Sequence, residues 1–151
     1  MNFESQPVPI EILLVEDNEG DVRLTREVLK TSKVRNNLII ANNGQEALDC
    51  LHHVGKYASA AHPDLILLDL NLPVMNGTEV LAKIKENDNF KRIPVVILTT
   101  SKAEEDILKT YNLHANCYLT KPVDLDQFVK VVKSMEDFWL AIVKLPSHQY
   151  E

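Results

Sequence analysis

The stretch "LILLDLNLPVMNG", from Leu65 to Gly77, decides the fold of this chain. Its four leading apolar residues are typical of a short strand buried on both faces, as in a parallel sheet. Asp69 ends the apolar run, and the proline, asparagine and glycine that follow indicate a turn. The sequence therefore predicts a buried strand with a carboxylate at its carboxyl end. We expect Gly77 to be a turn glycine with positive φ before the next helix.

Similar apolar runs and amphipathic segments alternate along the chain. The other predicted strands are Ile10 to Val15, Leu38 to Ala41, Val95 to Leu98 and Cys117 to Leu119. The predicted helices are Asp21 to Lys30, Gln45 to Leu51, Thr78 to Glu86, Glu104 to Leu113 and a fifth that follows Asp124. Five alternations of strand and helix predict an α/β fold with an open, doubly wound, five-stranded parallel sheet and helices on both faces. Ser101 with Glu104 fits a capping box, and Asp124 fits an N-cap.

The composition sets limits on the function. The chain has 151 residues, 45% of them hydrophobic and 25% charged, which is typical of one domain, and we expect a single domain over residues 1–151 with its core at about 8–135. A net charge of −6 argues against nucleic-acid binding. There is no long apolar segment and no signal peptide, so we expect a cytoplasmic protein with no membrane partner. Cys50 and Cys117 have no metal-binding spacing, so we expect reduced thiols.

Polar side chains stand where the predicted strands end. They are Glu16, Asp17, Asp69, Thr99 and, one position past Thr120, Lys121. Sites in such sheets form beyond the carboxyl ends of the strands, so we expect these groups to gather at one edge. Three carboxylates there would repel one another by several kcal/mol without a counter-charge, and Mg²⁺ prefers such oxygen ligands. A carboxylate, a metal, an ammonium and a hydroxyl together favour phosphoryl transfer onto Asp69.

Each of these residues also has a plainer interpretation. An aspartate that ends a strand is often only a turn former or a helix cap, and two adjacent acids can simply begin a turn. The presence of other polar residues at the ends of other strands favours the functional interpretation for Asp69. Tyr118 fits half-buried packing in an edge strand, and sequence pattern alone assigns it no further role.

Four motifs, "LLVEDNEGD", "LILLDLNLPVMNG", "IPVVILTTS" and "CYLTKP", together resemble the response-regulator receiver domain of two-component signalling. The resemblance spans about Glu11 to Lys133 and implies a flavodoxin-like fold with strand order 2-1-3-4-5. It implies that a histidine kinase phosphorylates Asp69 and that Mg²⁺ is the cofactor. It also implies that the chain assists its own phosphorylation and dephosphorylation without being a multi-turnover enzyme.

The resemblance carries over to individual residues. It implies that Asp17, Asp69 and the backbone carbonyl of Asn71 bind the metal, with Glu16 contributing through water. Glu16 stands where an aspartate is commoner. Thr99 and Tyr118 resemble the pair whose hydroxyl and ring respond to phosphorylation. Lys121 resembles the lysine that contacts the phosphoryl group. Pro122 resembles the proline that follows this lysine and is joined to it by a cis peptide bond.

Longer stretches narrow the resemblance. "EDNEGDVRLTREVL", "TTSKAEEDILKTYNLHANCYLTKPVDLDQF" and "SMEDFWLAIVKLP" are similar to the small regulators of cyanobacterial phytochromes. This implies that the partner kinase is a phytochrome-type light sensor. After Leu145 only "PSHQYE" remains, so we expect no output domain.

The carboxyl-terminal segment indicates self-association. If Asp124 to Leu145 were one helix, it would be about 33 Å long and would extend past the sheet. Its apolar residues follow a three-and-four spacing to the end and so form an apolar stripe along the helix. We expect a helical extension at about 136–145, whose part of this stripe needs a partner surface. Together with the family resemblance, this predicts a homodimer through the fourth helix, fifth strand and fifth helix, with Phe138, Trp139 and Ile142 at the interface. The alternative is that this segment folds back onto its own domain.

Two other classes of protein fit part of the pattern. A haloacid-dehalogenase-like phosphohydrolase also uses an aspartyl nucleophile with Mg²⁺ at a strand end, but it would need a second acid at Asn71. A flavodoxin-like flavin carrier would need a hydroxyl-rich loop after the first strand, where this chain has the acidic "VEDNEGD".

Overall fold

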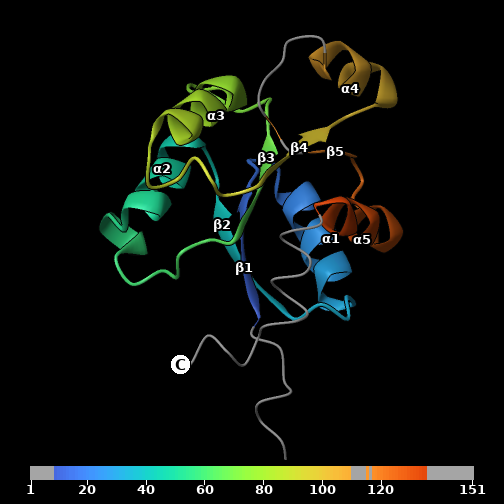
Figure 1. The fold of residues 1–151 in the computed structure, drawn as a ribbon, viewed down its shortest axis with the longest axis horizontal. Helices are drawn as coiled ribbons and strands as arrows, with labels where there is room; N and C mark the ends of the chain where they lie inside the picture. The colour runs from blue at the N-terminus through green and yellow to red at the C-terminus, as the bar shows by residue number, and fades with distance from the viewer. Residues whose placement is uncertain (1–8, 110–114, 116, 136–151) are drawn as a thin grey trace, which may run out of the picture.

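A five-stranded parallel sheet lies at the centre of the computed structural model, in the order β2-β1-β3-β4-β5 (Figure 1). The structure describes residues 9–109, 115 and 117–135. The strands are β1 (Ile10–Val15), β2 (Asn36–Ala41), β3 (Leu65–Asp69), β4 (Val95–Thr99) and β5 (Cys117–Thr120). The helices are α1 (Glu19–Lys30), α2 (Gly44–His52), the 3-10 turn η2 (Gly55–Tyr57), α3 (Gly77–Glu86), α4 (Lys102–Lys109) and α5 (Leu125–Ser134). The predicted fold class and strand order are confirmed.

The apolar strands form the sheet because successive side chains point to opposite faces and both faces are covered. Leu13, Ile66 and Ile97 belong to the cluster that packs with α2 and α3. Their neighbours Leu14 and Leu67 belong to the cluster that packs with α1 and α5. Figure 1 shows these two pairs of helices on opposite sides of the sheet. This two-sided burial explains the continuous apolar runs in the sequence.

The strand order places the ends of β1 and β3 side by side at the centre of one edge. Val15 pairs with Leu68, the residue before Asp69, and Asp69 pairs with Leu98, the residue before Thr99. β2 and β3 lie on opposite sides of β1 in the sheet. The loops that follow β1 and β3 therefore lead away from each other at this edge. A crevice at the carboxyl ends of the strands is therefore the expected place for a site.

Side-chain caps fix where the helices begin. Asn18, Asn43, Asn76 and Asp124 each accept a hydrogen bond from a backbone N–H in the first turn of the following helix. The predicted N-cap at Asp124 is confirmed. Ser101 Oγ accepts from Glu104 N at 3.1 Å, whereas the Glu104 carboxylate accepts from Thr100 N–H instead of Ser101 N–H. The Ser101 half of the predicted capping box is thus present, whereas the Glu104 side chain bonds to the residue before Ser101.

Some helices and strands begin earlier than predicted, because polar residues form their first positions. β2 begins at Asn36, two residues before the predicted Leu38. It is an edge strand, so one of its sides lacks a neighbouring strand and polar side chains are tolerated. α1 and α4 also begin two residues earlier than predicted, at Glu19 and Lys102.

The prediction that Gly77 has a positive φ was wrong. Among the described residues, positive φ occurs at His53, Val74 and Gly55. Gly77 is needed for close approach instead, because a Cβ there would lie 2.4 Å from Leu70 Cα and 2.6 Å from the Asp69 carbonyl oxygen. The glycine lets the start of α3 pack directly against the backbone that carries Asp69.

The condition that one helix runs without interruption from Asp124 to Leu145 is not met. α5 ends at Ser134, and Met135 has non-helical backbone angles, φ −90° and ψ 73°. The apolar spacing continues past this point, but spacing alone does not show that a helix is uninterrupted. The predicted extension at 136–145, with Phe138, Trp139 and Ile142, lies outside the described residues.

Two further observations concern the described part of the chain. None of its helices has the length and apolar character needed to cross a membrane. Cys50 is buried, Cys117 is half-buried, and both are free thiols, as the sequence predicts.

Candidate functional site

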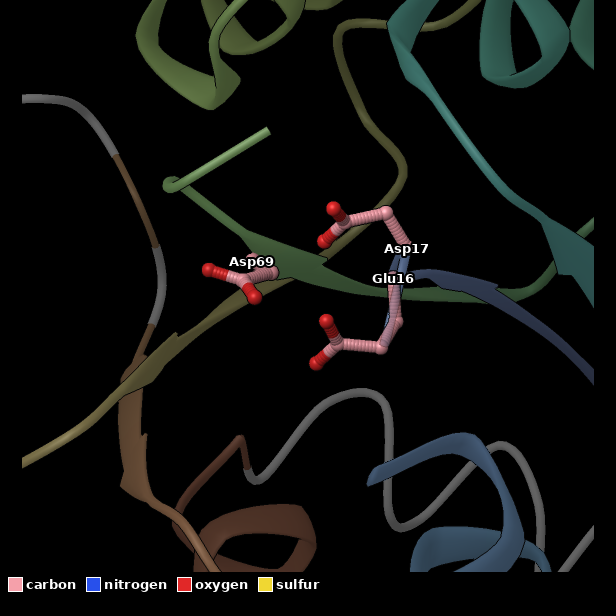
Figure 2. A group of neighbouring side chains, drawn as sticks. All are labelled: Glu16, Asp17 and Asp69. Carbon is pink, nitrogen blue, oxygen red and sulfur yellow. The ribbon is translucent and has the colours of Figure 1, made fainter. Parts of the chain in front are cut away.

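Four strands bring the predicted site residues to one edge of the sheet. Glu16 and Asp17 directly follow β1, and Asp69 and Thr99 are the last residues of β3 and β4. Lys121 follows β5, and its N–H donates to the Thr99 carbonyl at 2.7 Å, which continues the sheet pairing by one residue. Figure 2 shows the carboxylates of Glu16, Asp17 and Asp69 near one another, beyond the ends of β1 and β3.

The three carboxylates form a cluster that could hold a metal ion. Each offers an oxygen, and these oxygens all lie within 4.8 Å of one another. Glu16 and Asp69 are buried, whereas Asp17 is exposed. The cluster therefore has an open side at Asp17 and a closed side against the sheet.

Lys121 supplies the positive charge at the site. Its Nζ lies 3.0 Å from Asp69 Oδ2, 3.1 Å from Glu16 Oε1 and 3.1 Å from Asp21 Oδ2. The lysine side chain is 13% exposed, and its contacts with the buried Glu16 and Asp69 are shielded from water. An ammonium with three carboxylate partners is strongly held in its charged form, and the pKa of Lys121 is raised, because these contacts more than offset burial.

Asp21 is the residue that sequence reasoning missed. It lies in the first turn of α1, which begins where β1 ends, so its side chain reaches the same edge of the sheet. The sequence carries one signal for it, an acid at the third position after the N-cap Asn18. That signal is ordinary for a helix start, where acids are favoured by the helix dipole, and so it did not stand out.

The acids of the cluster differ in their affinity for protons. Burial, together with the neighbouring Asp69, raises the pKa of Glu16 to about 7. Burial also acts on Asp69, but contacts with Glu16, the Asn71 N–H and Lys121 outweigh it, so the pKa of Asp69 is lowered. Asp69 is therefore ionised at neutral pH, and its carboxylate is available as a nucleophile or a ligand.

The loop after Asp69 orients its carboxylate. Asn71 N–H donates to Asp69 Oδ1 at 2.8 Å, while Asp69 Oδ2 faces Lys121. The Lys121–Pro122 peptide bond is cis, as the resemblance implies. Both oxygens of Asp69 are thus held by the backbone of one loop and the side chain of another.

Thr99 lies beside this cluster with an unused hydroxyl. Its side chain is fully buried, and Oγ1 is the buried side-chain polar atom that has no hydrogen-bond partner within the described part of the chain. Burying a hydroxyl without a partner costs free energy, so such groups are uncommon and often functional. The hydroxyl is available to a ligand.

Tyr118 lies on β5, away from the acidic cluster. It is half-buried against the core cluster under α2 and α3, and Lys109 Nζ lies 5.7 Å from its ring centroid. Burial raises the pKa of its hydroxyl. The contact of Lys109 with this ring links α4 to β5. Within α4, Lys109 also pairs with the buried Glu105 at 2.9 Å.

Comparisons with known proteins identify the family. The model of the response regulator receiver domain matches residues 12–133. This chain belongs to the response regulator receiver family. Response regulator Rcp1 of Synechocystis sp. is 52% identical over 147 residues, which cover 97% of this chain and 99% of Rcp1. The recognition made from the four sequence motifs is confirmed, and it excludes the hydrolase and flavin-carrier alternatives.

Two solved structures are similar to this receiver over most of its length. The phosphorylated cyanobacterial phytochrome response regulator RcpA is 50% identical with a TM-score of 0.70, covering 89% of this chain and 96% of RcpA. The Mn²⁺-bound form of Rcp1 is 53% identical with a TM-score of 0.69, covering 91% of this chain and 99% of that one. The chain is therefore a receiver-domain response regulator homologous to phytochrome response regulators.

Proposed function

We propose that this receiver accepts a phosphoryl group from a histidine kinase onto Asp69, with Mg²⁺ as the cofactor, and signals through the resulting change of its surface. The observation that carries the proposal is the Asp69 carboxylate, ionised at neutral pH and held 3.0 Å from the Lys121 ammonium. A positioned carboxylate beside a fixed positive charge suits attack on phosphorus, where positioning and charge neutralisation supply most of the catalysis.

The chain's own residues support each part of the transfer. An oxygen of Asp69 forms the new bond to phosphorus, and the bond to the donor histidine breaks, so the imidazole leaves. The phosphoryl group brings negative charge to the edge of the sheet. Lys121 is close enough to follow that charge, and the Asn71 N–H holds the other Asp69 oxygen in place at 2.8 Å.

The signal follows from Thr99. Its buried Oγ1 lacks a partner in the described structure, and a phosphoryl oxygen on Asp69 is an acceptor of the kind that it needs. We infer that Thr99 moves to the phosphoryl group and that the Tyr118 ring turns towards the space that it leaves. The Tyr118 ring contacts Lys109 on α4, so its movement changes the surface made by α4, β5 and α5.

The donor set fits Mg²⁺, which neutralises phosphoryl charge and holds a phosphoryl oxygen when it is bound. Asp17, Asp69 and the Asn71 carbonyl would bind it directly, and Glu16 through water. Two ligands of one Mg²⁺ ion lie at most about 4.2 Å apart, and the three carboxylate oxygens already lie within 4.8 Å of one another. The Mn²⁺-bound form of Rcp1 supports a divalent cation here.

The partner kinase is inferred to be a phytochrome-type light sensor. The support is the similarity to RcpA, a phosphorylated cyanobacterial phytochrome response regulator, over 89% of this chain. We also infer a homodimer through α4, β5, α5 and the segment with Phe138, Trp139 and Ile142. The described part of that face carries a hollow of about 400 Å³ that is lined by Lys109, Tyr118 and Val131. Ile107 on α4 is an exposed apolar residue.

Intact mass spectrometry after incubation with acetyl phosphate and Mg²⁺ tests the phosphoryl transfer. The wild-type chain is expected to gain one phosphoryl group, and Asp69→Asn none. Asp88→Asn is the matched control, because Asp88 is a highly exposed aspartate away from the cluster. Phosphorylation of Asp69→Asn at the wild-type level, or repeated turnover of phosphate esters, would contradict the proposal.

A further inference from the structure

Asp21 is a fourth carboxyl group at the site, and it differs from the other three. It is not part of the cluster of Glu16, Asp17 and Asp69 whose oxygens lie within 4.8 Å of one another. Within the described part of the chain, its side chain pairs with Lys121, at 3.1 Å. Asp21 therefore joins the site through the Lys121 ammonium and not through the cluster that would hold a cation.

The three partners of Lys121 match the three protons of its ammonium. Glu16, Asp21 and Asp69 accept at 3.1, 3.1 and 3.0 Å, and the contacts join residues 105, 100 and 52 positions apart in the chain. Two of these partners, Glu16 and Asp69, have a second task in the proposed function. When they turn to a cation or to a phosphoryl group, Lys121 loses two of its three acceptors. Asp21 is the partner that remains.

The backbone of Asp21 is fixed independently of its side chain. Its N–H donates to the N-cap Asn18 at 2.9 Å, and α1 is anchored to the sheet by the buried Leu29. The Asp21 side chain is 33% exposed, against 1% for Glu16 and 4% for Asp69. Water can therefore solvate Asp21 when Lys121 moves away, so the lysine can leave and return at low cost.

We propose that Asp21 is a positioning residue that acts through Lys121: it holds the ammonium on the α1 side when Glu16 and Asp69 bind a cation, and releases it towards a phosphoryl group on Asp69. This inference rests on the proposed function. Without Asp21, the charged partners of Lys121 among the described residues are Glu16 and Asp69, and the lysine competes with the cation for their oxygens. Removal of Asp21 therefore weakens cation binding although Asp21 does not touch the cation.

A structural role for Asp21 predicts a different result. An acid in the first turn of α1 favours the helix through its dipole, and this effect does not depend on Lys121. A direct attraction between Asp21 and the cation does not depend on Lys121 either. A double-mutant cycle separates these roles, because only positioning through Lys121 makes the two substitutions non-additive.

The test is titration calorimetry of Mg²⁺ with four full-length chains at fixed ionic strength: wild type, Asp21→Asn, Lys121→Met and the double variant. We expect Asp21→Asn to weaken Mg²⁺ binding about fivefold when Lys121 is present. We expect at most about a twofold effect in the Lys121→Met background, where only attraction through space remains. Asp21→Glu, which keeps the charge, is expected to restore part of the affinity.

Glu27→Gln is the matched control, because Glu27 is an exposed acid on α1 that pairs with Lys30, away from the site. It is expected to leave Mg²⁺ affinity unchanged. Equal effects of Asp21→Asn in the two backgrounds, or no effect in either, would overturn the inference alone. Wild-type protein that binds Mg²⁺ but takes no phosphoryl group from acetyl phosphate would overturn the proposed function. The calorimetric cycle would still decide whether Asp21 acts on Mg²⁺ binding through Lys121. Absence of Mg²⁺ binding by the wild type would overturn both.

Discussion

At the scale of single residues, Thr99 lowers the stability of the unphosphorylated protein. Its hydroxyl is fully buried without a partner in the described structure. We expect Thr99→Val to raise the free energy of unfolding of the unphosphorylated protein by about 1 kcal/mol, because an unsatisfied polar group is removed. Urea unfolding measures this change.

Thr100→Val is the control for that substitution. Thr100 is exposed, and its Oγ1 donates to Glu104 Oε2 at 3.0 Å, so the same change there is expected to lower stability slightly. A clear loss of stability in Thr99→Val would show that the hydroxyl has a partner after all.

Glu16 makes the stability of the metal-free protein depend on pH. Its pKa is about 7 in the fold, against 4.5 for the free side chain, so the folded state binds the proton more tightly. This contribution to stability is complete below pH 4.5 and is lost as the pH rises through 7. Asp69, whose pKa is lowered, has the opposite effect but only at more acidic pH.

We therefore expect Glu16→Gln to raise the midpoint of urea unfolding at pH 7 and to raise it much less at pH 5. Both proteins are measured in a chelator, so that cations do not bind the cluster. Comparison with the wild type cancels the contributions of the groups that the two proteins share. An equal effect of the substitution at both pH values would contradict the raised pKa of Glu16.

At the scale of elements, the start of α3 depends on one missing side chain. A Cβ at Gly77 would meet backbone atoms of Leu70 and Asp69, which cannot rotate away. We expect Gly77→Ala to lower the free energy of unfolding by about 2 kcal/mol or more and to slow phosphorylation, because the backbone of Asp69 must shift. Unfolding curves and the acetyl phosphate assay measure the two effects.

Gly20→Ala serves as the comparison. Gly20 lies in the exposed first turn of α1, and a Cβ there would meet only the end of the Asn18 side chain, at 3.1 Å. A much smaller change is expected. Equal effects at the two glycines would show that helix propensity, and not the close approach, is the cause.

The elements themselves were largely predictable, and the exceptions have physical reasons. Central strands such as β3 are buried on both faces, so their apolar runs identify them. The polar start of β2 at Asn36 was missed because an edge strand needs less apolar surface. The end of α5 at Ser134 could not be placed from the sequence, because an apolar spacing can continue past the residue where the helix stops.

At the scale of the whole molecule, the site follows from topology more than from any single motif. Parallel strands end at one edge, which is why Asp17, Asp69, Thr99 and Lys121 could be placed together from the sequence. Asp21 could not, because its contact depends on how the first turn of α1 is turned towards Lys121. The close approach at Gly77 likewise depends on the packing of α3 against the sheet.

The proposed dimer is a property of the whole chain. We expect Trp139→Ala to weaken self-association about tenfold or more, because a large aromatic residue at an interface often contributes much of the binding energy. Sedimentation velocity over a range of concentrations measures the change. Leu24→Ala is the control, since Leu24 is an exposed apolar residue on α1. Unchanged association of Trp139→Ala would argue that its segment folds back onto its own domain.

The contacts of Lys121 reach across 105, 100 and 52 positions of the chain, and the lysine is the last of these residues to be synthesised. A nascent polypeptide that has not yet emerged beyond β5 contains the acids without their ammonium. On the proposed function, competence for phosphorylation is therefore acquired only after Lys121 has been synthesised, and a product that ends before this residue is expected to take phosphoryl groups poorly from the kinase.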